Sequence, residues 1–143
     1  LVTTNDSVQL ANDAPLSNTN WIKAGLIAGA LAAVVVLLAQ LLTLQAFPEA
    51  AAFEPLRSYP RTVAFVMIPA LLASRLYAWL IRHSARPVAT FVAISFVVLL
   101  LSFIPDFALP LGGKTALGST IAAGLHVIAA VIIVPVLILL HRK

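Results

Sequence analysis

His126 is the polar residue whose surroundings most suggest chemistry. An imidazole can ligate a metal or a haem, or hydrogen-bond a neighbouring helix. Small residues lie three, four and eight positions away, so on a helix they share its face. These residues are Gly118, Ala122, Ala123, Ala129 and Ala130. They leave room beside the ring for a closely packed helix, or for the flat face of a macrocycle ligated by the imidazole.

Two roles for His126 follow from this pattern. The spacing of small residues before the histidine resembles the pigment-binding helices of light-harvesting polypeptides, which implies a haem or chlorophyll-type pigment. The simpler role is a hydrogen bond between helices, with Ser74, Ser95 or Ser102 as the partner. We favour the hydrogen bond and expect no cofactor, because a lone histidine in a membrane helix more often bonds to a neighbouring helix. A haem with two histidine ligands from this chain would need His83 or His141, and both lie at the wrong depth.

Other groups that could do chemistry are few. Arg75 is the only charged residue within an apolar run, and it lies close enough to Arg82 for its side chain to reach the interface. The sequence places Glu49, Glu54 and Asp106 in external loops, so we expect no relay of protons or cations through the membrane. There is no cysteine, no phosphate loop and no Ser-His-Asp arrangement, and we therefore predict that the protein is not an enzyme and binds no metal.

Four apolar runs must position these residues, at 24–44, 62–81, 88–104 and 115–140. A helix of about 20 apolar residues crosses the hydrocarbon core of a bilayer. Hydrophobic residues make up 62% of the chain and charged residues 10%, which is more apolar surface than a soluble domain of this size can bury. We predict an all-α integral membrane protein, a four-transmembrane-helix bundle over residues 21–143. A disordered, polar, flexible tail over residues 1–20 precedes it.

Small residues also recur along the first run, at Gly25, Gly29 and Ala33. With Gly118 and Ala122 they are the predicted helix-packing positions, because small side chains let helix backbones approach closely. Whether the partner helix belongs to the same chain or to another subunit stays open. Loops are expected at 82–87, 46–60 and 105–114. The apolar segment 50–53 is expected on the membrane surface or against a partner, and Gly112 and Gly113 are expected to form a turn.

Basic residues favour one orientation. Lys and Arg are enriched on the cytoplasmic side of membrane proteins. The side that holds both termini would carry five of them, and the other side three. The five are Lys23, Arg82, Arg86, Arg142 and Lys143, and the three are Arg57, Arg61 and Lys114. We expect both termini in the cytoplasm and membrane lipids as partners, and we expect no nucleic acid because no basic groove or stripe is present.

The second half of the chain resembles a known group. The segments 90–92, 98–102, 122–126 and 133–137 are similar to small uncharacterised bacterial four-helix membrane proteins, grouped as domains of unknown function. The resemblance implies a four-helix bundle in the bacterial inner membrane. Our leading interpretation is a non-catalytic accessory or scaffolding subunit of a larger membrane complex, respiratory or photosynthetic, with other integral membrane subunits as partners. The alternatives are a pigment-binding subunit that uses His126, and a small transporter or channel lined by Gln40, Thr43 and Gln45.

Overall fold

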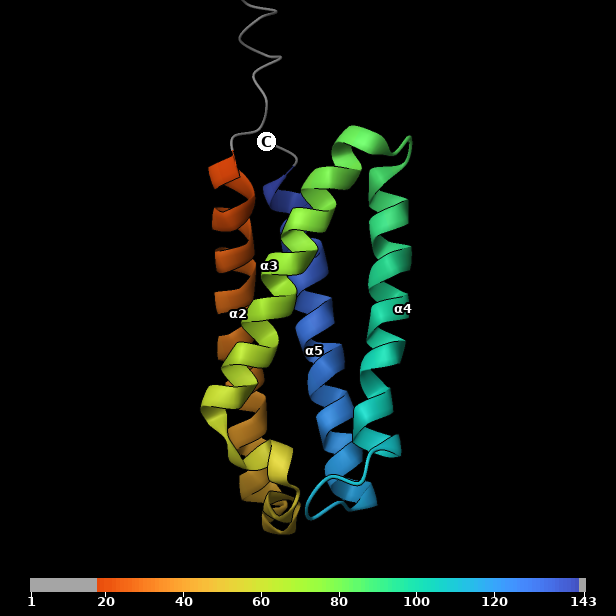
Figure 1. Ribbon diagram of the computed structural model, residues 1–143. Coiled ribbons are helices and arrows are strands. Elements are labelled where there is room, and N and C mark those ends of the chain that lie inside the picture. The colour runs from red at the N-terminus through yellow and green to blue at the C-terminus, as the bar shows by residue number, and fades with distance from the viewer. Residues whose placement is uncertain (1–17, 142–143) are drawn as a thin grey trace, which may run out of the picture.

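The computed structural model describes residues 18–141, and four long helices account for most of them (Figure 1). They are α2 (Asn18–Ala46), α3 (Tyr59–His83), α4 (Pro87–Ala108) and α5 (Ala116–Leu140). Two short 3-10 helices, η1 (Pro48–Ala52) and η2 (Glu54–Arg57), connect α2 to α3. Each long helix is long and apolar enough to cross a membrane. The predicted four-helix membrane fold is confirmed, whereas the predicted tail lies outside the described residues, apart from its last three, which begin α2.

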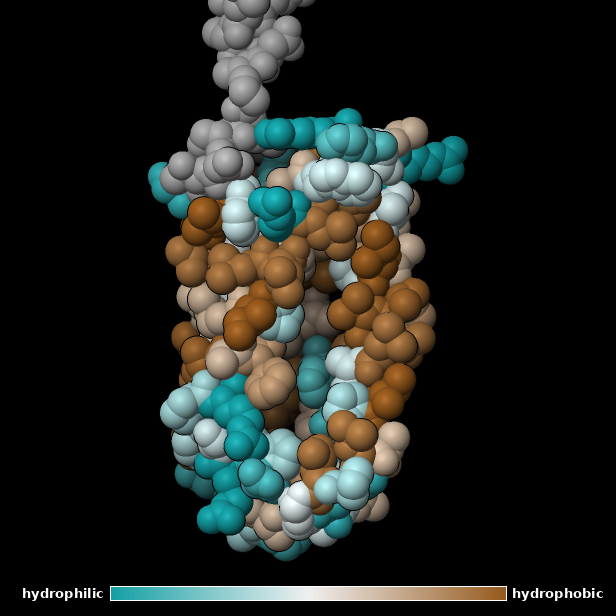
Figure 2. All heavy atoms as spheres, viewed as in Figure 1, coloured by the Kyte–Doolittle hydropathy of each residue, from teal (hydrophilic) through white to brown (hydrophobic). Residues whose placement is uncertain are grey.

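Each long helix runs antiparallel to the one before it (Figure 1). The start of α2, the turn between α3 and α4 and the end of α5 lie together, and we call this the terminal end (Figure 1). The 3-10 helices and the α4–α5 turn form the opposite, loop end. Helix α2 packs most extensively on α3 and next on α5, and α4 packs mainly on α5. Hydrophilic residues gather at both ends of the face in Figure 2 and hydrophobic residues lie between them, as a bilayer requires.

The contact between α2 and α3 depends on small residues. Gly25 and Gly29 are buried, and a Cβ atom on Gly25 would lie 3.1 Å from the Cα of Leu71. A Cβ atom on Gly29 would lie 2.8 Å from Sδ of Met67 and 3.1 Å from Cβ of Ala70. The face that the sequence marked with Gly25, Gly29 and Ala33 therefore meets α3 of the same chain at its two glycines. Ala33, which continues this face, is 7% exposed.

The expectation for the apolar segment 50–53 was wrong. Ala50 and Phe53 are fully buried and pack with Leu56 and Ala122, so this segment covers the bundle of its own chain. Burial removes the phenyl ring from water at the loop end, which explains why the segment folds inward. The amide Nε2 of Gln40 anchors the same loop, because it donates a hydrogen bond of 2.8 Å to the carbonyl of Leu56.

The end of α4 also differs from the expectation. The sequence predicted that the helix ends before Pro105, but the helix continues to Ala108. The last carbonyl groups of a helix lack partners within it, and side chains from the following segment supply them here. Oγ of Ser119 donates to the carbonyl of Asp106 at 2.6 Å, and the ammonium group of Lys114 donates to the carbonyl of Phe107. The positive charge of Lys114 also interacts favourably with the negative, C-terminal end of the α4 helix dipole.

Candidate functional site

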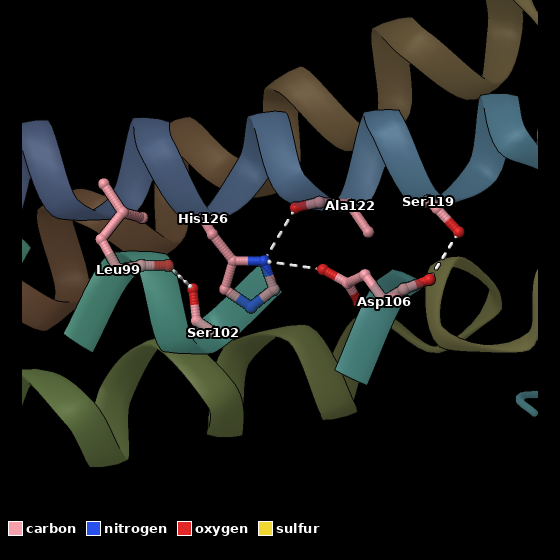
Figure 3. Close-up of polar contacts among 6 residues, drawn as sticks. All are labelled: Leu99, Ser102, Asp106, Ser119, Ala122 and His126. Atoms are coloured by element: carbon pink, nitrogen blue, oxygen red, sulfur yellow. Dashed lines mark hydrogen bonds and ion pairs between the residues drawn. The ribbon is translucent and has the colours of Figure 1, made fainter. Parts of the chain in front are cut away.

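The extension of α4 brings Asp106 into contact with His126 of α5 (Figure 3). Nδ1 of His126 lies 3.3 Å from Oδ2 of Asp106 and 2.9 Å from the carbonyl oxygen of Ala122. The two residues are 20 positions apart in sequence. They meet because antiparallel helices α4 and α5 both tilt their side chains toward their own N-termini, so the two side chains converge.

The contacts at Nδ1 determine which ring nitrogen is left for other partners. A backbone carbonyl can only accept a hydrogen bond, so the bond to Ala122 requires a proton on Nδ1. The proton points toward that carbonyl, with the Asp106 carboxylate at ion-pair distance beside it. In a neutral imidazole Nε2 then carries a lone pair, which can accept a hydrogen bond or ligate a metal.

The two members of the pair differ in burial. The Asp106 side chain is 6% exposed, whereas that of His126 is 39% exposed. At a rise of about 1.5 Å per residue, His126 lies about 15 Å along α5 from its loop end, within the thickness of a bilayer core. Figure 2 shows a hollow between α3 and α4 with hydrophilic surface inside it. Polar side chains at this depth normally face protein or a water-filled cavity. We therefore expect water, a ligand or another protein to cover the exposed part of His126.

Two predictions about this region were wrong. Asp106 is not in an external loop, and a carboxylate does lie within a candidate span. Two of the three predicted serine partners of His126 make other bonds: Oγ of Ser74 donates to the carbonyl of Trp21 and Oγ of Ser102 to that of Leu99. The signal that sequence reasoning passed over is the position of Asp106 directly after Pro105. That position is external only if the proline ends the helix.

Two of the small residues near His126, Gly118 and Ala122, contact the loop end rather than open space. A Cβ atom on Gly118 would lie 2.7 Å from Cβ of Phe53, and Ala122 is 5% exposed and packs in the cluster that contains Phe53. Part of the space proposed for a macrocycle is therefore filled by this chain's own side chains. A flat ligand would have to approach His126 from the side of α3 and α4.

Two of the three polar residues considered for a solute pathway, Gln40 and Thr43, bond to the backbone of this chain. Gln40 is fully buried and holds the loop, and Oγ1 of Thr43 donates to the carbonyl of Ala39 within α2. Within residues 18–141 no group of three or more His, Cys, Asp or Glu side chains is arranged to hold a metal ion. The contact between Asp106 and His126 joins the side chains of two spans and neither caps a helix nor holds a loop, so we take this pair as the candidate site.

Fold and site together define a four-helix membrane protein with a histidine–carboxylate pair between its last two spans. A family model matches residues 13–143, and the chain belongs to that family, a family of unknown function named DUF6069. The predicted resemblance to proteins of unknown function is confirmed, and it extends well beyond the second half of the chain. No curated protein and no solved structure significantly matches the chain.

Proposed function

We propose that the protein is a non-catalytic accessory subunit that binds a transmembrane segment of another membrane protein beside His126. The observation that carries the proposal is the His126 side chain, 39% exposed at membrane depth and next to a buried carboxylate. Lipid tails offer no hydrogen bonds, so a polar group that faces them is costly. A partner helix with a hydrogen-bonding side chain would satisfy Nε2 and cover the hollow between α3 and α4.

The architecture of the chain supports a binding role. The four helices and their short connections use nearly all of residues 18–141, which leaves a reaction only the loops or the spaces between helices. Helix α4 is the least enclosed of the four, with Phe91 and Asp106 as its buried residues. One side of α4 is therefore free to pack against a helix of the partner protein.

The test compares three variants after purification in mild detergent. We expect His126→Leu to lower the recovery of the partner chain about threefold to twentyfold, because hydrogen bonds between membrane helices contribute about 0.6 kcal/mol on average and about 1.7 kcal/mol at most. His126→Gln, which can still donate and accept, should change recovery less than twofold. Val131→Ala is the matched control, because Val131 lies on the same helix and is 64% exposed on the surface of the chain.

Crosslinking in intact membranes makes the same test independent of detergent. A photoreactive side chain at Ser102, which lies beside His126 in Figure 3, should link to the chain that copurifies. The same group at Val131 should link to lipid. The proposal is wrong if His126→Leu leaves the copurifying chains unchanged and the Ser102 position captures lipid alone.

A haem- or chlorophyll-type pigment on His126 is the second candidate. The observation in its favour is that Nδ1 is held by Ala122 and Asp106, which is how proteins orient an imidazole that ligates through Nε2. Such a protein would show a visible absorption band after purification, and His126→Gln would remove or shift it. A colourless protein whose partner recovery depends on His126 would favour the helix-binding role instead.

We also propose that both termini face the cytoplasm of a bacterial inner membrane. The start of α2 and the end of α5 lie at the same end of the bundle, and this terminal end carries more basic residues than the loop end does. A cysteine introduced at Ser58, in the α2–α3 connection, should react with an impermeant reagent in intact spheroplasts. Labelling only after lysis would reverse the orientation, and a cysteine replacing Ala85 in the α3–α4 turn is the control for the opposite side.

A further inference from the structure

The last turn of α4 lies between two prolines, Pro105 and Pro110. A carbonyl group within a helix accepts a hydrogen bond from the amide four residues later. For the carbonyl of Asp106 that residue is Pro110, which has no amide hydrogen. Asp106 is 5% exposed, so water does not replace the missing donor. The carbonyl of Asp106 therefore needs a donor from outside α4, because a buried carbonyl without one is costly.

Ser119 of α5 supplies this donor. Its Oγ donates to the carbonyl of Asp106 at 2.6 Å, and the residue is 1% exposed. The backbone of Ser119 is itself fixed, because it lies in the first turn of α5. Oγ1 of Thr115 caps this turn by accepting from the amide of Gly118 at 3.0 Å, and the amide of Ser119 donates to the carbonyl of Thr115. The hydroxyl group of Ser119 is thus presented to α4 from a rigid position.

Asp106 contacts the same face of α5 twice (Figure 3). Ser119 and His126 are seven positions apart, so they share a helix face about 10 Å apart along the axis. The carbonyl of Asp106 meets Ser119, and its Oδ2 lies 3.3 Å from Nδ1 of His126. Within residues 18–141 Oδ2 of Asp106 is buried and makes no hydrogen bond. The shorter bond at the main chain is therefore better suited than the longer side-chain contact to fix the position of Asp106.

We propose that Ser119 is a positioning residue for the pair of Asp106 and His126. Its hydroxyl group holds the last turn of α4 against α5 and so keeps the Asp106 carboxylate beside Nδ1 of His126. Without the hydroxyl group, this turn gains by moving its free carbonyl toward water at the loop end, and the carboxylate of the same residue moves with it. The site is the one on which the proposed function rests, but the contact can be measured in this chain without a partner.

Solid-state NMR of the full chain in lipid bilayers can measure the contact. The readout is the dipolar coupling between the labelled Nδ1 of histidine and the labelled carboxyl carbon of aspartate, and Asp106→Asn gives the blank. We expect Ser119→Ala to lose at least about half of this signal, because the carbonyl of Asp106 is left without a donor. Ser119→Thr keeps a hydroxyl group and should retain the signal. Thr120→Ala is the matched control, because Oγ1 of Thr120 bonds only within α5, to the carbonyl of Ala116.

The variants separate the hydroxyl group of Ser119 from other causes. Loss of the signal in Ser119→Ala, with Ser119→Thr and Thr120→Ala unchanged, supports the positioning role. A signal that persists in Ser119→Ala overturns it, as does an equal loss in Ser119→Thr or in Thr120→Ala. Unchanged helix content and unchanged signals of Gly25 and Gly29 show that the rest of the bundle stays folded.

Recovery of the partner chain is a separate measurement on the same variants. If Ser119→Ala loses the contact between Asp106 and His126 and also lowers recovery, both the positioning role and the helix-binding function are supported. If the contact is lost and recovery is unchanged, the positioning role is supported and the helix-binding function at this pair is wrong.

Discussion

Gly113→Ala should lower the free energy of unfolding by about 3 kcal/mol, because two separate costs meet at this residue. Gly113 has φ of +66°, a conformation that residues with a side chain adopt only at a cost. A Cβ atom there would also lie 1.6 Å from the carbonyl oxygen of Ala52, so the backbone would have to move. The movement would separate η1 from the α4–α5 turn and weaken the burial of Phe53. Thermal unfolding in mild detergent is the measurement.

Gly112→Ala is the matched control for this prediction. The three atoms nearest to a Cβ atom on Gly112 all belong to the flexible side chain of Glu54, and the closest is a carboxylate oxygen at 3.1 Å. The side chain can move aside, so we expect a loss of less than about 1 kcal/mol. Equal unfolding midpoints for Gly112→Ala and Gly113→Ala would show that the contact between the two turns contributes little. The hydrogen bond from the amide of Glu54 to the carbonyl of Gly112, at 2.9 Å, should persist in the control.

Gly29→Leu should lower the free energy of unfolding by about 2 kcal/mol and separate α2 from α3. The leucine would have to displace Met67 and press on Cβ of Ala70 in a seam with no free space. Met67 is flexible and can yield in part, but Ala70 is fully buried and cannot. The unfolding midpoint and the elution profile in detergent should both change.

Gly124→Leu is the control for Gly29→Leu, because nothing lies within 4 Å of a Cβ atom at Gly124. The same substitution there adds an apolar side chain to an exposed surface of α5 and should leave the unfolding midpoint nearly unchanged. If the two variants behave alike, close approach of α2 and α3 is not required for stability. A loss confined to Gly29→Leu would instead assign the effect to the α2–α3 seam.

The helices could be predicted from composition and length because the physics of the bilayer leaves few choices. An apolar run within lipid must satisfy every backbone group internally, and a helix does so. The ends of the helices were harder to predict. Pro105 indicated a helix end because it has no backbone donor. Ser119 and Lys114, which lie beyond the helix, nevertheless donate hydrogen bonds to carbonyl groups of its last turn. Local sequence does not reveal partners that arrive from another element.

The pairing of side chains was decided by the tertiary structure. The sequence marks His126 as noteworthy but contains no measure of how α4 and α5 are rotated about their axes. That rotation depends on the fit of small residues, such as Gly118 beneath Phe53, and on loops that hold the helix ends.

The sequence by itself determined the environment of the protein, its helices and the order in which they cross the membrane, because apolar length alone decides these. Only the tertiary structure decided that Asp106 meets His126 and that Ser119 donates to the carbonyl of Asp106. The physical reason is that lipid covers any apolar helix face equally well. Helix rotation and depth are therefore set by contacts between elements far apart in the chain.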